Sequence, residues 1–203
     1  MSVADIDAPS RDLEAKTADQ EAPESLREVA DRMSDMLPPG FRVEILRGSI
    51  VVSPSPSKRH NGITSRIQNQ LFGQLPEELI VLQTQSVGED RAVDFAVPDT
   101  MVVPQYVEDE KGDFVDPGVT EMVVEVVSPS NPENDTHTKL REYAAFGIPI
   151  YLIVDPRDGT VALWCNPEKG KYQEVHTSKF GEPVALPSPL DGVTIDTSRF
   201  NTY

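Results

Sequence analysis

The sequence predicts an α/β (α+β) domain in which a mixed central β-sheet is flanked by helices. Amphipathic helical patterns alternate along the chain with short runs rich in Val and Ile, an order typical of a sheet covered by helices. The run Glu121–Val127 is almost continuously apolar and indicates a strand that is covered on both faces. The sequence contains neither an internal repeat nor a glycine-rich phosphate loop.

The length of 203 residues fits one domain and a tail. Residues 1–24 are polar, lack a periodic apolar face and are predicted to be a disordered acidic tail, followed by one domain over 25–203. No apolar run approaches the about 18 residues that a membrane span requires, so we expect a soluble protein without a membrane partner. The first residues show no secretory signal, which predicts a cytoplasmic location.

The charge and the cysteine content limit the possible partners. Cys165 is the only cysteine, which excludes an intramolecular disulfide and leaves too few thiols for a structural zinc site. The formal net charge of -16 opposes binding to nucleic acid. It can also be explained simply as a means of keeping the protein soluble. A DNA partner therefore requires a local basic strip or a divalent metal ion that offsets the charge.

The N-terminal part of the domain has three readable elements. Ser25–Leu37 has apolar residues at helical spacing and ends at Pro38, which predicts a short amphipathic helix. Arg42–Leu46 and Ile50–Ser53 are predicted to form a hairpin through a turn that contains glycine. Lys58–Leu75 carries an apolar residue at every fourth position and is predicted to be a helix with one buried stripe.

The middle and the end of the chain alternate strands with one helix. The helix is predicted over 132–146, because Ser130 and Glu133 have the spacing of a capping box and Gly147 supplies a stop. An acidic loop is expected at Glu108–Pro117. Besides Glu121–Val127, the expected strands are Leu79–Gln85, Ala92–Val97, Thr100–Val103, Ile150–Val154, Thr160–Cys165 and Lys171–His176.

Two acidic residues occupy positions in or next to strands where a carboxylate is unexpected. Glu125 lies within an apolar strand, and Asp99 lies after Pro98 at the beginning of another strand. A buried ionised carboxylate must find a cation or a metal, or else become neutral. A pair of such acids suits Mg²⁺ or Mn²⁺. The alternatives are that Glu125 faces solvent at a strand edge and that Asp99 is only a turn residue.

The helix that follows Glu125 adds a cationic face. Asp135, Lys139 and Tyr143 are spaced four residues apart and therefore share one side of the helix. Lys139 can place an ammonium group beside a metal-bound water or a phosphate. The simpler alternative is an ordinary surface ion pair between Asp135 and Lys139, which contributes only about 0.3–0.5 kcal/mol.

These residues carry a resemblance to a known family. Over about residues 40–200 the chain resembles the Uma-two family of restriction-endonuclease-like proteins, which belongs to the PD-(D/E)XK nuclease superfamily. The segment Glu125-Val126-Val127-Ser128-Pro129-Ser130 is the most distinctive match. The others are Glu44, the Ser-Pro repeat at 53–56 with His60, Pro98-Asp99, Asp135, Lys139, Tyr143, Gly147 and the run Leu152-Ile153-Val154-Asp155-Pro156.

The resemblance implies a restriction-endonuclease-like core, with Asp99 and Glu125 as metal ligands. In the superfamily pattern a lysine lies two residues after the second acid, where this chain has Val127. Lys139 is therefore expected to take the catalytic role from the next helix. The resemblance also suggests Glu44 as an outer ligand, with a purely structural role as the alternative. His60 is expected to contact substrate or carry a proton, unless it only makes a local hydrogen bond at the helix end.

The function expected from these observations is Mg²⁺-dependent (or Mn²⁺-dependent) endonuclease hydrolysis of phosphodiester bonds in DNA. Asp99, Glu125 and Lys139 are the expected catalytic residues, with Asp135 and Tyr143 as supporting residues. One alternative is a catalytically inert module that keeps the nuclease fold for binding or regulation. Another is a metal-dependent hydrolase of a smaller phosphodiester. A homodimer would supply two cuts, although the sequence shows no interface.

Overall fold

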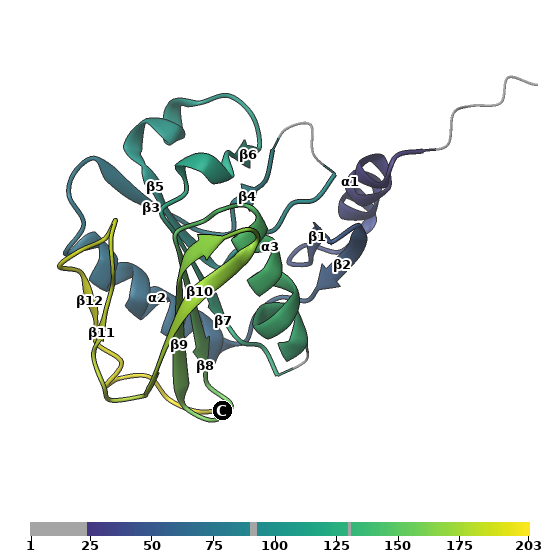
Figure 1. Ribbon diagram of the computed structural model, residues 1–203. Coiled ribbons are helices and arrows are strands. Elements are labelled where there is room, and N and C mark those ends of the chain that lie inside the picture. The colour runs from purple at the N-terminus through teal and green to yellow at the C-terminus, as the bar shows by residue number, and fades with distance from the viewer. Residues whose placement is uncertain (1–23, 90–92, 130) are drawn as a thin grey trace, which may run out of the picture.

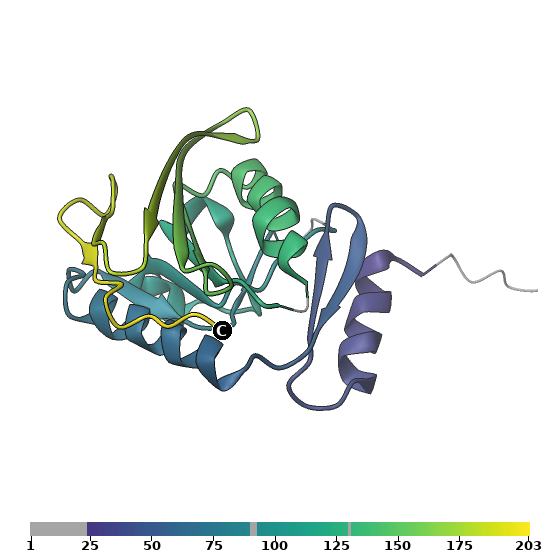
Figure 2. The ribbon, with the colours of Figure 1, turned by 90° about the horizontal axis from the view of Figure 1, so that it is seen from below.

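A computed structural model of the chain describes residues 24–89, 93–129 and 131–203 (Figures 1 and 2). Residues 1–23 of the predicted tail and Ser130 of the predicted capping box lie outside the described residues. Within the described ranges, no helix is both long enough and apolar enough to cross a membrane. A six-stranded sheet forms the centre of the molecule, with helices on both faces, which confirms the predicted fold class.

The strands of the central sheet follow one another in the order β10-β9-β8-β7-β5-β3. β7 and β8 are parallel, and every other neighbouring pair is antiparallel, so the sheet is mixed as predicted. A parallel pair needs a crossover connection, and the helix between β7 and β8 supplies it. The strands are β3 (Leu79–Leu82), β5 (Thr100–Pro104), β7 (Met122–Val126), β8 (Ile150–Asp155), β9 (Thr160–Glu168) and β10 (Lys171–Lys179).

The two faces of β7 contribute to different layers of the core. Val124 and Val126 pack in a cluster with residues of α2 (Lys58–Phe72), on one side of the sheet. Val123 packs in a second cluster with residues of α3 (Lys139–Ala145), which covers the other side. Because side chains alternate along a strand, Glu125 shares the α3 side with Val123.

A helix and a hairpin form a separate layer beside the sheet (Figure 2). The helix α1 (Leu26–Met36) has Ser25 as its N-cap within a capping box, and the predicted helix is confirmed. The hairpin of β1 (Arg42–Leu46) and β2 (Ser49–Ser53) is also confirmed. Its two turn residues, Arg47 and Gly48, have φ values of 53° and 71°. Positive φ at both positions is the requirement of a type I′ turn.

The predicted strand Ala92–Val97 is wrong over the residues that the structure describes, and Ala92 itself lies outside them. Phe95 and Ala96 form only isolated bridges, with Ile45 and Val87 respectively. The predicted strand Leu79–Gln85 also ends early, because Thr84 has a φ of 48°, which breaks the extended backbone after Leu82.

Several very short elements were not predicted. β4 (Ser86–Val87) pairs with β6 (Phe114–Val115), which lies inside the expected acidic loop Glu108–Pro117. β11 (Val184–Ala185) pairs with β12 (Thr194–Ile195) near the C-terminus. The short helices η1 (Gln105–Asp109) and η2 (Pro117–Val119) flank β6. Two-residue strands are too short to show an alternating pattern, so sequence periodicity cannot detect them.

The predicted helix over 132–146 is confirmed, with one irregularity. The chain is helical over 132–145, but η3 (Asn134–Thr138) is a π-helical turn that leads directly into α3. Such π-turns often occur at functional sites. This one carries Asp135 and immediately precedes Lys139.

Candidate active site

One pocket of about 220 Å³ collects charged side chains from segments that are far apart in the sequence. Most of the lining residues come from the β1–β2 hairpin, the beginning of α2, the residue before β5, the end of β7 and the η3–α3 helix. The charged and titratable residues that line the pocket are Arg42, Glu44, His60, Asp99, Glu125, Asp135 and Lys139. Every predicted site residue except Tyr143 therefore lines this pocket.

Lys139 is the centre of the first half of the site. Its Nζ lies 2.7 Å from Oε1 of Glu125, 2.9 Å from Oε1 of Glu44 and 4.0 Å from Oδ1 of Asp135. The hydroxyl of Tyr143 donates a 2.7 Å hydrogen bond to the same Oε1 of Glu125. The four-residue spacing of Asp135, Lys139 and Tyr143 thus directs the three side chains to one place.

Two of the simpler alternatives are wrong. Asp135 and Lys139 are both buried, so they do not form a surface ion pair. Glu125 is 1% exposed and does not face solvent. A carboxylate at this depth is stabilised by the ammonium of Lys139 and the hydroxyl of Tyr143, because its burial without partners would be costly.

Asp99 is the centre of the second half of the site. Its Oδ1 accepts a 2.8 Å hydrogen bond from Nη1 of Arg42, and its Oδ2 lies 2.9 Å from Nε2 of His60. The backbone N–H of Val126 also donates to Oδ2, at 2.9 Å. Because Val126 follows Glu125 in β7, this bond holds the two acidic residues beside each other. Asp99 is buried and is therefore more than a turn residue.

Glu44 and His60 have local contacts as well as a place in the pocket. Glu44 accepts a 2.7 Å hydrogen bond from the backbone N–H of Val97 through the oxygen that also contacts Lys139. The backbone N–H of His60 donates to the N-cap side chain of Ser57. Among the described residues, Nδ1 of His60 has no hydrogen-bond partner. Glu44 and His60 therefore each make a local hydrogen bond and also line the pocket.

The surroundings move the pKa values of the two central acids in opposite directions. Burial raises the pKa of Glu125 well above its usual value, Lys139 opposes this, and repulsion from Asp99 adds to the increase. Burial also acts to raise the pKa of Asp99, but the contacts with His60 and Arg42 outweigh it and hold that pKa well below its usual value. Asp99 is thus ionised, whereas Glu125 resists ionisation without a further cation.

The charge on Lys139 is fixed, whereas the charge on Asp135 depends on pH. Burial acts to lower the pKa of Lys139, but Glu125, Glu44 and Asp135 outweigh it and raise that pKa above its usual value. Lys139 is therefore an ammonium ion and not a base. Burial, against the attraction of Lys139, raises the pKa of Asp135 to about 6.

The donor set of the pocket fits a hard divalent ion. The buried carboxylates of Glu44, Asp99, Glu125 and Asp135 outnumber the two permanent cations, Arg42 and Lys139. Burial is the main cause of the raised pKa values of Glu125 and Asp135, and repulsion from the neighbouring carboxylates adds to it. A divalent cation would relieve the repulsion, and carboxylate oxygens are the ligands that Mg²⁺ and Mn²⁺ prefer.

The interpretation of the sequence missed Arg42, which forms an ion pair with Asp99. It lies two residues before Glu44 in β1, so the two side chains share one face of the hairpin. That spacing could have placed Arg42 beside Glu44, but it gives no sign of the contact with Asp99. Asn131 and Asn134 also line the pocket, and their position in the loop and π-turn carried no signal of its own.

Comparisons with known proteins agree with this architecture. The model of the family Uma2, described as "Putative restriction endonuclease", matches residues 27–198. A crystal structure from Anabaena variabilis ATCC 29413, described as "a putative nuclease belonging to DUF820", is similar with a TM-score of 0.64 and 17% sequence identity. The similarity covers 82% of this chain and 90% of that one, and it shows a shared fold.

No curated protein matches the sequence of this chain. The family match is nevertheless extensive, because it begins within α1 and ends after β12. It includes each of the residues that line the pocket. The chain therefore belongs to the Uma2 family, the Uma-two family that its sequence resembles.

Proposed function

We propose that this protein is an endonuclease that hydrolyses phosphodiester bonds in DNA with the help of Mg²⁺ or Mn²⁺. The observation that carries the proposal is the convergence of Asp99, Glu125 and Lys139 in one buried pocket, although they come from three separate segments. The family description and the nuclease name of the similar crystal structure support the same reaction class.

Asp99 and Glu125 are the residues that would hold the metal ion. When bound, such an ion lowers the pKa of a bound water and offsets charge on the scissile phosphate. Glu44 uses one carboxylate oxygen for both Lys139 and the backbone of Val97, so its role in the proposal is to position Lys139. Arg42 and His60 fix the orientation of the Asp99 carboxylate, because each contacts one of its two oxygens.

Lys139 has an electrostatic role in the proposed reaction. A lysine at this place could either orient the attacking water or help to deprotonate it. The raised pKa of Lys139 favours the first role, because an ammonium ion has no lone pair to accept a proton. It can orient the water and stabilise the additional negative charge on phosphorus oxygens in the transition state. The proton of the water then goes to a carboxylate, to His60 or to solvent.

Basic side chains beside the pocket support a nucleic-acid substrate despite the net charge of -16. Arg47 and Arg141 line two neighbouring hollows, of about 500 and 630 Å³. Asn134 lines the larger hollow and the active-site pocket, so these surfaces adjoin. Lys171 and Trp164 line the other hollow. The basic side chains can bind the phosphate backbone, and the ring of Trp164 can stack on an unstacked base.

The direct test is the nicking of supercoiled plasmid by the purified full-length protein with Mg²⁺ or Mn²⁺. We expect cleavage that EDTA stops and that Asp99→Asn and Glu125→Gln each reduce by at least about a thousandfold, because each removes a charged ligand. Glu108→Gln changes an exposed acid outside the pocket and is the matched control. If the two site variants cleave as fast as the control, a contaminating nuclease is responsible and the proposal fails.

Two further measurements separate the proposal from its alternatives. Titration calorimetry with Mn²⁺ distinguishes an enzyme from an inert module, because the working site takes up metal and Glu125→Gln loses that uptake. No heat at millimolar Mn²⁺ favours the inert module. A panel of plasmid, single-stranded DNA and dinucleotides then identifies the substrate. If only the dinucleotides are hydrolysed, the substrate is a smaller phosphodiester and not DNA.

A further inference from the structure

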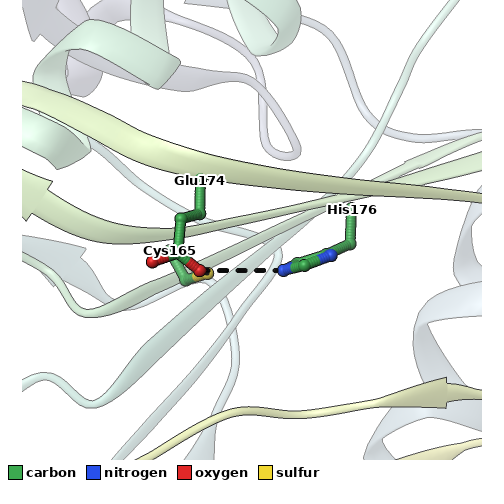
Figure 3. A group of neighbouring side chains, drawn as sticks. All are labelled: Cys165, Glu174 and His176. Carbon is green, nitrogen blue, oxygen red and sulfur yellow. Dashed lines mark hydrogen bonds and ion pairs between the residues drawn. The ribbon is translucent and has the colours of Figure 1, made fainter.

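A group of side chains of the kinds that can hold a metal ion lies on the hairpin of β9 and β10, at the edge of the central sheet (Figure 3). Cys165 and Glu174 are direct partners in the antiparallel register. His176 lies two residues after Glu174, so its side chain is on the same face of β10. The backbone pairing of the two strands thus brings together a thiol, a carboxylate and an imidazole.

The distances within this group are close to those of a tetrahedral metal site. Sγ of Cys165 lies 3.9 Å from Oε2 of Glu174, and Nε2 of His176 lies 3.8 Å from the same oxygen. The three ligand atoms all lie within 4.8 Å of one another. Tetrahedral Zn²⁺ with ordinary bond lengths places such atoms roughly 3.4–3.6 Å apart. Small side-chain rotations are therefore enough to close the remaining gap.

The exposure of the three residues favours such a rotation. The side chains of His176 and Glu174 are 68% and 55% exposed, so both can rotate without displacing the core. Cys165 is buried and fixed, and it provides a rigid anchor on the neighbouring strand. The arrangement combines one fixed ligand with two adjustable ones on paired strands.

The donor atoms select a different metal from that of the active-site pocket. The pocket offers carboxylate oxygens, which suit Mg²⁺ and Mn²⁺. The hairpin offers one sulfur, one imidazole nitrogen and one oxygen, a set that suits Zn²⁺. We propose that Cys165, Glu174 and His176 form a Zn²⁺ site whose fourth position is open to water.

This site differs from the structural zinc sites that the single cysteine excludes. A closed site of several thiolates is impossible here, but three mixed protein ligands and one water form the usual open zinc site. Burial and the neighbouring Glu174 raise the pKa of the Cys165 thiol. The thiol is therefore protonated at neutral pH without metal, and zinc uptake releases its proton.

The test uses Co²⁺ as a spectroscopic substitute for Zn²⁺ in the full-length protein, with a phosphine reductant that does not bind metal. A thiolate ligand gives a sulfur-to-cobalt charge-transfer band in the near ultraviolet, and intense visible bands indicate tetrahedral coordination. We expect both with one equivalent of Co²⁺ and their loss when one equivalent of Zn²⁺ is added. Absence of the charge-transfer band overturns the proposal.

Variants assign the bands to the three residues. His176→Ala changes an exposed side chain and should weaken Co²⁺ and Zn²⁺ binding by at least about a hundredfold without affecting folding. Cys165→Ser should abolish the charge-transfer band. His137→Ala, at another exposed histidine outside the group, is the matched control and should bind as the unmodified chain does. Equal affinity in the His176 and His137 variants overturns the proposal.

Two additional results separate this site from the active-site pocket. The Asp99→Asn variant should retain the Co²⁺ spectrum, because Asp99 is not part of the hairpin group. Zn²⁺ at about a hundredfold excess over its Kd should raise the Tm by on the order of 5 °C, and His176→Ala should remove that increase. A Tm increase that persists in His176→Ala and vanishes in Asp99→Asn would assign the zinc to the other pocket and overturn the proposal.

Discussion

The two faces of β7 differ in what they contribute to the protein. Towards α2 the strand presents Val124 and Val126, which pack among apolar side chains such as Ile67. Towards α3 it presents Glu125, whose carboxylate contacts Lys139 and Tyr143. Both faces are fully buried. One five-residue strand therefore supports an apolar core on one side and a charged site on the other.

The comparison shows where stability and function are located in this fold. Apolar burial stabilises the α2 side by about 25 cal/mol per Å² of area removed from water. On the α3 side, the desolvation of Glu125 and Lys139 offsets much of their mutual attraction. Because this charged group contributes little net stability, a chemical role is the better explanation for its presence beside the apolar cluster around Val123. Four predictions test this division.

The largest effect is expected for Lys139→Met, which removes the shared cation of the site. Glu125 and Glu44 then remain buried without their cation, and the free energy of unfolding should fall by about 3–5 kcal/mol at pH 8. Urea denaturation followed by circular dichroism measures the change. The double variant Lys139→Met/Glu125→Gln should recover part of it, because the amide is neutral. Lack of recovery would show that lost packing, not an unpaired charge, causes the instability.

On the other face, Ile67→Ala in α2 tests the apolar layer. Ile67 is completely buried, and its truncation should cost about 2–5 kcal/mol through lost burial and a cavity. The active-site contacts lie on the opposite side of the sheet, so plasmid nicking per folded molecule should remain within about twofold of the unmodified protein. A thousandfold loss in correctly folded protein would show that the two faces are not separate in function.

The strands with the clearest patterns could be predicted from the sequence, and so could the central site. Glu125 stood out because an acid in an apolar strand requires a partner, and Lys139 because it shares a helix face with Asp135 and Tyr143. Asp99 in isolation was ambiguous, since Pro-Asp also occurs in ordinary turns. The resemblance to the Uma-two family decided between these interpretations.

Features that depend on tertiary contacts could not be predicted. The roles of Arg42 and His60 come from contacts with Asp99, which is distant from both in the sequence. The π-turn η3 gives no periodic signal that differs from an α-helix over so few residues. The cluster of Cys165, Glu174 and His176 depends on the register of a hairpin, which a pattern of apolar residues predicts only within a few positions.

The third prediction concerns pH, and it separates the charged face from the apolar face without a substitution. The folded-state pKa of Asp135 is raised from 3.8 to about 6. Between these values the folded protein binds more protons than the unfolded chain, so the free energy of unfolding should fall as pH rises from about 4 to about 6, by on the order of 2 kcal/mol. Asp99 has a lowered pKa, and its opposite effect therefore belongs to a lower pH range.

Denaturation of the metal-free protein in EDTA over pH 4–8 measures this dependence. Asp135→Asn removes the titrating group and should flatten the profile, whereas Ile67→Ala should shift the profile downward at every pH. The raised pKa of Glu125 acts in the same direction as that of Asp135, so a residual slope in Asp135→Asn is expected. An Asp135→Asn profile as steep as that of the unmodified chain would contradict the assignment to Asp135.

The smallest effect is expected outside the pocket, where Arg141 lies exposed on α3 beside Arg47. If a DNA strand crosses this surface, Arg141→Gln removes one phosphate contact. The KM for plasmid should increase by about three- to tenfold at moderate salt, and the slope of log affinity against log salt should decrease by about one. The kcat should not change, because Arg141 does not line the pocket.

Lys111→Gln, in the loop before β6, is the matched control and should change neither the KM nor the salt slope. An unchanged KM and salt slope in Arg141→Gln would place the DNA elsewhere and restrict the functional part of the α3 face to the residues around Lys139.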